Sequence, residues 1–284
     1  MEATIPTEKL GIILKIGFFG FLAFIGLIVF GVLLRFAGIL ISGAIGTFGA
    51  ALVANAVSVR VFERRPLVAL GLNWHSGSLR NLWIGVAAGV TAAILIIGGP
   101  VLAGAAHFEK TPDAPGSLSA AAFVTGILIF GAVGEELLFR GYGFQVLLGS
   151  VGRIATLAPT SLLFGWAHTS NQNASTLGIV NTIGFGVVLG YAFIRSGDLW
   201  LPIGLHFGWN WILPLAGTNL SGFTMGVTGY AVRWNVAEIW SGGAYGPEGS
   251  VLTCGIIVAL MAFLYKAPVQ PQRPLLYPGR EQEA

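Results

Sequence analysis

The stretch Gly134-Glu135-Glu136-Leu137-Leu138-Phe139-Arg140 decides how this sequence is interpreted, because it places three charges directly after an uncharged apolar run, Ala120–Val133. A charge in hydrocarbon costs free energy, so an ionisable cluster inside a membrane span is by default a hypothesis for a functional site. On a helix, Glu136 and Arg140 are four residues apart and meet on one face, whereas Glu135 and Arg140 are five apart and diverge. We therefore expect Glu136 and Arg140 to pair and the carboxylate of Glu135 to point elsewhere.

The composition is typical of a membrane protein. Of the 284 residues, 55% are hydrophobic and only 10% are charged, and the mean hydropathy is +0.79. Soluble domains contain about 25% charged residues, and apolar runs near the length of about 20 residues that a span requires recur along this chain. The sequence predicts an all-α polytopic membrane protein, a bundle of about eight transmembrane helices. The spans are expected near residues 11–34, 37–59, 82–104, 118–148, 154–168, 176–194, 199–215 and 250–266.

The basic residues indicate the orientation in the membrane. The chain has 15 Lys and Arg against 12 Asp and Glu, a net charge of only +3, so no nucleic-acid partner is expected. The connection at residues 60–80 contains Arg60, Arg64, Arg65 and Arg80, and the positive-inside rule places it in the cytoplasm. Alternation along eight spans then places both termini in the cytoplasm and leaves Arg35, Lys110 and Arg233 outside. The prediction is a multi-pass protein of the cell membrane.

Outside the spans, the sequence indicates loops and a tail. Residues 1–267 are expected to form a single transmembrane domain, and the proline-rich residues 268–284 a disordered cytoplasmic tail. The stretch 217–249 is rich in Gly, Ser and Thr and is interpreted as an outer loop, with a short hairpin around Tyr230 to Val236. Cys254 is the only cysteine, which excludes a disulfide framework.

Two histidines stand in apolar runs. His168 ends the run Leu-Leu-Phe-Gly-Trp-Ala-His at residues 162–168, and His206 lies in the run at residues 201–211, four positions before Asn210 on the same helical face. A lone intramembrane His often makes only a hydrogen bond between helices, but beside a two-Glu cluster a function is favoured. A carboxylate with a His can activate a water, and a second His with an Asn amide can donate hydrogen bonds to a developing oxyanion. The chemistry that fits is hydrolysis of a peptide bond.

Three alternatives remain open on the residues alone. Glu and His from separate helices could bind zinc, although no HExxH motif is present. A binding or immunity protein could keep the same fold without turnover, but it would not need a base together with an oxyanion site. A transporter could use the cluster as a proton or ion site, but no internal repeat is visible.

Taken in order, these motifs resemble those of the CAAX protease and bacteriocin-processing (CPBP) family, whose best-known members are the Ras-converting CAAX endopeptidases. The motifs are EExxxR (Glu135, Glu136, Arg140), FxxxH (Phe164, His168) and HxxxN (His206, Asn210). The resemblance covers about residues 119–215. The segments Glu63–Leu72 and Ser241–Ser250 are also similar to bacterial members, without an assigned role.

The resemblance implies an eight-helix intramembrane endopeptidase with a membrane-associated protein or peptide as its substrate, and a cavity open to the cytosol. It implies that Glu135 and His168 activate the water and that His206 and Asn210 form the oxyanion hole. The supporting residues are Glu136, Arg140 and Phe164. The favoured form needs no cofactor; in a metal-dependent form, Glu135, His168 and His206 would bind zinc. A prenylated substrate is not implied.

Overall fold

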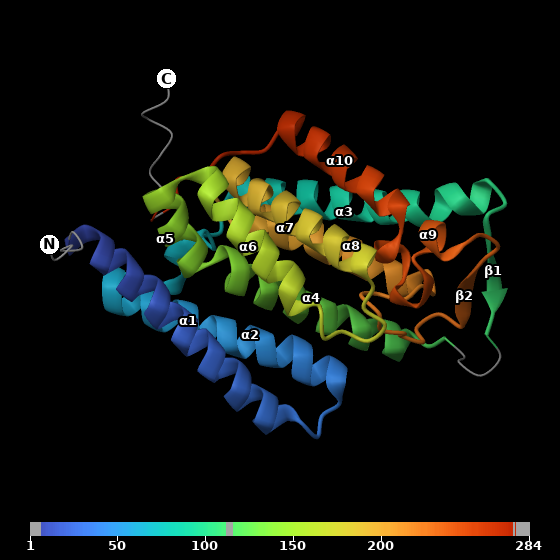
Figure 1. Ribbon diagram of the computed structural model, residues 1–284, viewed down its shortest axis with the longest axis horizontal. Coiled ribbons are helices and arrows are strands. Elements are labelled where there is room, and N and C mark those ends of the chain that lie inside the picture. Colours follow the sequence, from blue (N-terminus) through green and yellow to red (C-terminus); the bar gives the residue numbers. More distant parts are fainter. Residues whose placement is uncertain (1–6, 112–115, 275, 277–284) are drawn as a thin grey trace, which may run out of the picture.

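The computed structural model is a bundle of helices with a small two-stranded sheet at one end (Figure 1). It describes residues 7–111, 116–274 and 276. The helices are α1 (Thr7–Leu34), α2 (Ile39–Ser58), α3 (Ser76–Leu102), α4 (Leu118–Arg140), α5 (Tyr142–Val151), α6 (Arg153–Ala167), α7 (Thr176–Ser196), α8 (Trp200–Leu215), α9 (Glu238–Ser241) and α10 (Val251–Lys266). Short helical turns are η1 (Val59–Glu63), η2 (Leu67–Leu70), η3 (Gly243–Tyr245) and η4 (Pro247–Gly249). The predicted all-α polytopic fold is confirmed.

Five helical segments in the described part of the chain are long and apolar enough to cross a membrane. They are Lys9–Leu34, Ile39–Glu63, Ser76–Leu102, Leu118–Val151 and Thr176–Ser196. The helices α6, α8 and α10 fall where spans were predicted, but they have only 15 or 16 residues. The number of eight spans therefore stays a prediction.

The predicted single span at residues 118–148 is interrupted at Gly141, between α4 and α5. The side chain of Asn55 on α2 enters the break: its Nδ2 donates to Leu137 O at 2.9 Å, and its Oδ1 accepts from Tyr142 N at 2.6 Å. Asn55 thus bonds backbone groups that the broken helix leaves open, as membrane burial requires. A Cβ at position 141 would collide with Oδ1 of Asn55, so only glycine leaves room for it.

The helices α3 and α8 pack backbone against backbone. Gly85 and Gly89 of α3 face Gly204 and Gly208 of α8, and a Cβ at any of the four would collide with a carbonyl oxygen of the opposite helix. Small residues four apart permit such close approach between membrane helices. The contact gives α8, which contains His206 and Asn210, a rigid neighbour.

The two strands pair over a long sequence distance. β1 (Ala106–Lys110) runs antiparallel to β2 (Tyr230–Trp234), with Ala106 opposite Trp234. The predicted local hairpin around Tyr230 to Val236 is therefore wrong, because β2 finds its partner in the connection between α3 and α4. This pairing fastens the 217–249 loop to that connection.

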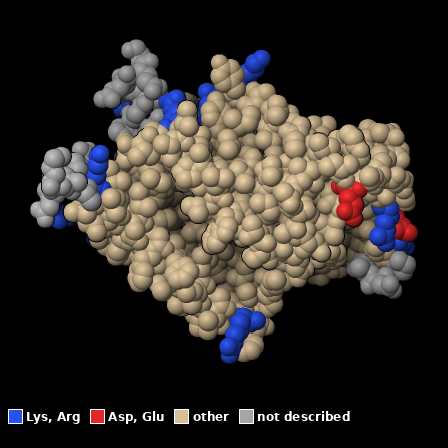
Figure 2. Space-filling model, viewed as in Figure 1, with Lys and Arg blue, Asp and Glu red and all other residues tan. Residues whose placement is uncertain are grey.

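The bundle has two distinct ends. We call the first the Arg-rich end; it is formed by residues 60–75, 196–200 and 266–274, where Leu199 N donates to Gly71 O and Gln272 N to Ser196 O. The second, the sheet end, is formed by β1, β2 and the loops at residues 168–175 and 217–249. Figure 2 shows a broad uncharged face between the charged residues at the two ends, apart from one basic group at its lower edge. Such a face is suited to lipid.

The segment after α10 makes hydrogen bonds to the bundle where the structure describes it. Gln270 N donates to Oδ1 of Asn81, and Asn81 Nδ2 donates in return to Gln270 O and to Asp198. These bonds hold residues 268–274 against α3 and the turn between α7 and α8. Most of the remaining predicted tail, residues 275 and 277–284, lies outside the described residues.

Candidate active site

The four predicted catalytic residues line one cavity of about 480 Å³. Glu135 comes from α4, His168 directly follows α6, and His206 and Asn210 lie one turn apart on α8. Three segments well separated in the sequence therefore converge on one space, as the motifs predicted.

The carboxylate of Glu135 faces both histidines. Its Oε2 lies 3.8 Å from Nε2 of His168 and 3.8 Å from Nε2 of His206, and this buried oxygen has no direct hydrogen-bond partner. Both distances are longer than a direct hydrogen bond, which is about 2.7–3.2 Å. A polar contact of this length is commonly bridged by water. Both distances therefore leave room for a water between Glu135 and either histidine.

Glu136 forms the predicted pair with Arg140. Arg140 Nη1 lies 3.0 Å from Glu136 Oε1, and both side chains are buried. Arg140 Nη2 also donates to Gly186 O on α7 at 3.0 Å. The same Oε1 lies 2.8 Å from Nδ1 of His206, a contact that was not predicted. Glu136 therefore fixes the position of His206 as well as balancing the charge of Arg140.

The partners of the two histidines set their protonated nitrogens. Nδ1 of His168 lies 2.7 Å from Phe164 O, and because a carbonyl only accepts, this nitrogen carries the proton. Nδ1 of His206 faces the carboxylate of Glu136 and likewise carries a proton. In both residues Nε2 is the atom turned toward Glu135. These assignments follow from the hydrogen-bond network.

Phe164 lies between the charged groups of the site. Its ring centroid is 4.8 Å from the ring of His168 and 6.2 Å from that of His206. The guanidinium carbon of Arg140 lies 4.7 Å from the same centroid, a cation–π contact. The Phe of the FxxxH motif thus packs against three site residues at once.

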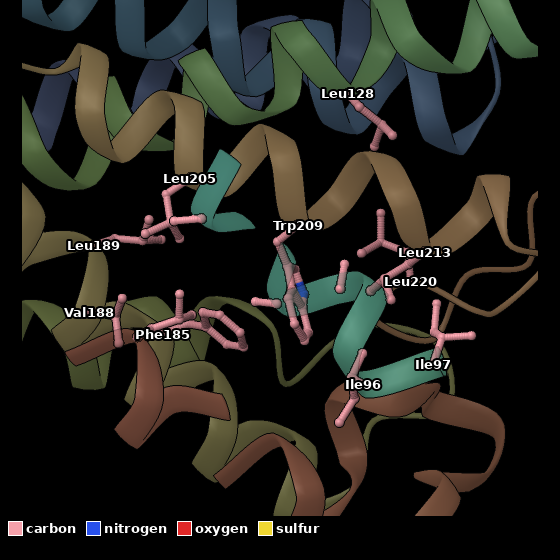
Figure 3. Packing of buried hydrophobic residues seen from close by; sticks show 14 of the residues in the cluster. Ile96, Ile97, Leu128, Phe185, Val188, Leu189, Leu205, Trp209, Leu213 and Leu220 are labelled. Carbon is pink, nitrogen blue, oxygen red and sulfur yellow. The ribbon is translucent and has the colours of Figure 1, made fainter. Parts of the chain in front are cut away.

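An apolar cluster supports the site from behind. Figure 3 shows Trp209 of α8 surrounded by residues from α3 and α7, including Ile96 and Phe185. The rings of Trp209 and Phe185 have centroids 4.8 Å apart. Because Trp209 precedes Asn210, this packing limits the motion of α8 at the cavity.

Glu248 is a cavity residue that the sequence analysis missed. It lies on η4 and lines the cavity, and it accepts from Trp209 Nε1 at 3.1 Å and from N and Oγ of Ser221. Asn171, three positions after His168, donates to Ser221 O at 3.2 Å. We call this chain of bonds, Trp209–Glu248–Ser221–Asn171, the outer clasp. It joins the ends of α8 and α6 that carry the site.

Glu248 is buried, and burial raises the pKa of its carboxyl against the opposing effect of the bonds from Trp209 and Ser221. In the described part of the chain, Glu248 has three hydrogen-bond donors but no Lys or Arg within ion-pair distance. Burying such a carboxylate in its charged form costs free energy. The only sequence signal was an acidic residue in the glycine-rich segment Ser241–Ser250, already noted as similar to bacterial family members. That signal does not reveal which helices the residue joins.

Comparison with known proteins finds similarity over the segment that contains the site. Residues 115–212 match the family model described as type II CAAX prenyl endopeptidase, Rce1-like. An uncharacterized 24.3 kDa protein of Escherichia coli is 33% identical over 139 residues, which are 48% of this chain and 60% of that relative. The chain thus matches less than two thirds of the relative's length. No solved structure matches. The predicted resemblance is confirmed: the segment that contains every predicted site residue matches this family model.

Proposed function

We propose that this protein is an intramembrane endopeptidase that hydrolyses a peptide bond of a membrane-associated protein or peptide. The observation that supports it is the convergence of Glu135 Oε2 with Nε2 of His168 and of His206, each at 3.8 Å, in a cavity between apolar helices. The family match over residues 115–212 supports the same class of activity.

In the proposed reaction, a water held between Glu135 and His168 is the nucleophile. Nδ1–H of His168 is donated to Phe164 O, so its Nε2 has a free lone pair, and the Glu135 carboxylate is the second acceptor. As the water oxygen bonds to the carbonyl carbon, one of the two water protons passes to the carboxylate of Glu135, while Nε2 of His168 keeps the water oriented. The tetrahedral intermediate collapses when that proton passes to the departing amine nitrogen.

His206 and Asn210 stabilise the oxyanion in this proposal. Because Nδ1–H of His206 is donated to Glu136, its Nε2 can donate to an oxyanion only in the imidazolium form. The neighbouring carboxylates of Glu135 and Glu136 favour that positive charge, and the Asn210 amide supplies the second donor. Donors that are already oriented in a water-poor site make a large contribution to such catalysis.

A metal-dependent form would use Glu135, His168 and His206, a donor set that suits zinc. In the described residues, no three side chains of His, Cys, Asp or Glu are arranged to hold a metal ion. The proposed reaction is the metal-free one, and zinc stays the alternative. Cleavage that persists in excess chelator agrees with the metal-free reaction. Cleavage that is lost in chelator and then restored by zinc contradicts it.

The test is cleavage of a membrane peptide library by the purified protein. Glu135→Gln is the inactive variant, and Glu238→Gln, a glutamate on α9 outside the cavity, is the matched control. Products formed by the wild type and by Glu238→Gln but not by Glu135→Gln support the proposal. If the wild type releases no more product than Glu135→Gln, the chain is a non-catalytic binding or immunity protein of the same fold.

A further inference from the structure

A second cavity lies outside the candidate active site, between α3 and α10. Its volume is about 510 Å³, within the range of about 300–1,000 Å³ that is usual for ligand sites. Residues of β2 and α9 border it on one side, where Figure 1 shows the ends of α3, α9 and α10 close to the sheet. It shares no lining residue with the cavity that contains Glu135. We call it the α3–α10 cavity.

The lining of the α3–α10 cavity is apolar apart from two indole N–H groups. Among the described residues that border it, the side chains other than Trp234 and Trp240 are those of Gly, Ala, Pro, Val, Leu and Ile. An extended peptide would leave backbone N–H and C=O groups without partners there, which is costly in a membrane. An acyl chain has no polar groups to satisfy, so this lining suits an acyl chain better than a peptide strand.

The α3–α10 cavity extends from the sheet end into the apolar part of the bundle. Trp234 and Trp240 border it at the sheet end, and Leu95 borders it about 10 Å before the end of α3. Trp is enriched at the level of lipid headgroups. In the described part of the chain, neither of these two indoles donates a hydrogen bond to another residue. Both N–H groups are therefore available to the ester or phosphate oxygens of a lipid.

Two glycines keep the α3–α10 cavity open. Gly99 of α3 and Gly255 of α10 both line it, and a Cβ added at either would meet no atom within 4 Å. They differ in this from Gly85 and Gly89, whose position is explained by contact with the backbone of α8. Leu95, which lines the same cavity, is 58% exposed, so the cavity lies on the surface of the bundle that faces lipid.

We propose that the α3–α10 cavity binds one acyl chain of a membrane phospholipid, with the headgroup beside Trp234 and Trp240. The proposal is independent of the endopeptidase function, because the two cavities are separate. The bound lipid differs from the lipids around the rest of the bundle in that it stays with the protein in detergent.

The first experiment counts retained phospholipid by native mass spectrometry after purification in mild detergent. Gly255→Leu fills the α3–α10 cavity, and Gly98→Leu, on α3 but outside the lining, is the matched control, because a Cβ at either position meets no atom within 4 Å. Leu forms helix better than Gly, so both variants should fold. We expect one phospholipid on the wild type and on Gly98→Leu, and at least a tenfold lower occupancy on Gly255→Leu. Equal occupancy in all three proteins overturns the proposal, and so does a wild type that takes up no added dioleoyl phospholipid.

The second experiment needs no variant to fold. The wild type is reconstituted with a phospholipid that carries a diazirine on one acyl chain, and the crosslinked residues are mapped after illumination. We expect at least fivefold more crosslinking in residues 95–105 and 252–256 than at Phe21 and Phe24, which are exposed on α1. Even crosslinking over all these positions would show ordinary bilayer contact and overturn the proposal. A wild-type dimer that Gly255→Leu dissociates and Gly98→Leu preserves would place a second copy of the chain in the cavity, and would overturn it as well.

Discussion

Glu135 and Glu136 are adjacent in the sequence, but their surroundings differ. Glu136 bonds Arg140 and His206 and is fully buried, whereas Oε2 of Glu135 has no direct partner. Glu135→Gln should therefore abolish cleavage and leave the protein folded. Glu136→Gln should also lower the melting temperature, because breaking a buried ion pair costs about 3–5 kcal/mol. Thermal unfolding and turnover of both variants measure this difference. A stable, inactive Glu136→Gln beside an active Glu135→Gln would reverse the two roles.

Asn210 is the proposed second donor to the oxyanion. If it donates to the oxyanion, Asn210→Ala should lower turnover by about 10²–10³ with little change in substrate binding. Asn210→Asp should be at least as harmful, because a carboxylate would repel the oxyanion. A bond between helices would instead contribute only about 0.6 kcal/mol. Normal turnover per folded molecule with a lower melting temperature would therefore remove Asn210 from the site.

At the scale of elements, the outer clasp gives a prediction of its own. In Glu248→Gln, an amide NH₂ replaces one acceptor and faces donors of Ser221 or Trp209, a mismatch that costs about 1–3 kcal/mol. If the clasp positions His168 and α8, kcat should fall while KM changes little. Hydrogen exchange should rise in residues 168–174 and 219–223. Glu238→Gln, from the same loop, is the control and should change neither. Faster exchange with unchanged kcat would make the clasp purely structural.

The elements differ in how well the sequence predicts them. The helix ends fall within a few residues of the predicted spans for α6, α7, α8 and α10, because hydropathy along one segment determines them. The break at Gly141 was not predictable, because it depends on Asn55 from a different helix. The partner of β2 and the place of Glu248 were missed for the same reason: both depend on how the 217–249 loop folds back on the bundle.

At the scale of the whole molecule, the arrangement of the site was the most predictable feature. Three motifs with membrane-buried charges and histidines had to converge, because isolated charges in hydrocarbon are too costly. The contribution of the loops at residues 168–175 and 217–249, which supply Ser170, Ser221 and Glu248 to the cavity lining, was not predictable from them.

The orientation of the whole chain gives the last prediction. A fluorescent protein that folds only in the cytoplasm should fluoresce when fused at the C-terminus, and an alkaline phosphatase that is active only outside should be inactive there. A phosphatase fused after Asn173, beyond α6, should be active, because that loop belongs to the sheet end, which is predicted to lie outside. Both expectations follow from the Arg residues at positions 60–80, because a loop rich in Arg stays in the cytoplasm and so fixes the side on which the other loops lie. An active phosphatase at the C-terminus would show that the orientation in the membrane is the reverse of the predicted one.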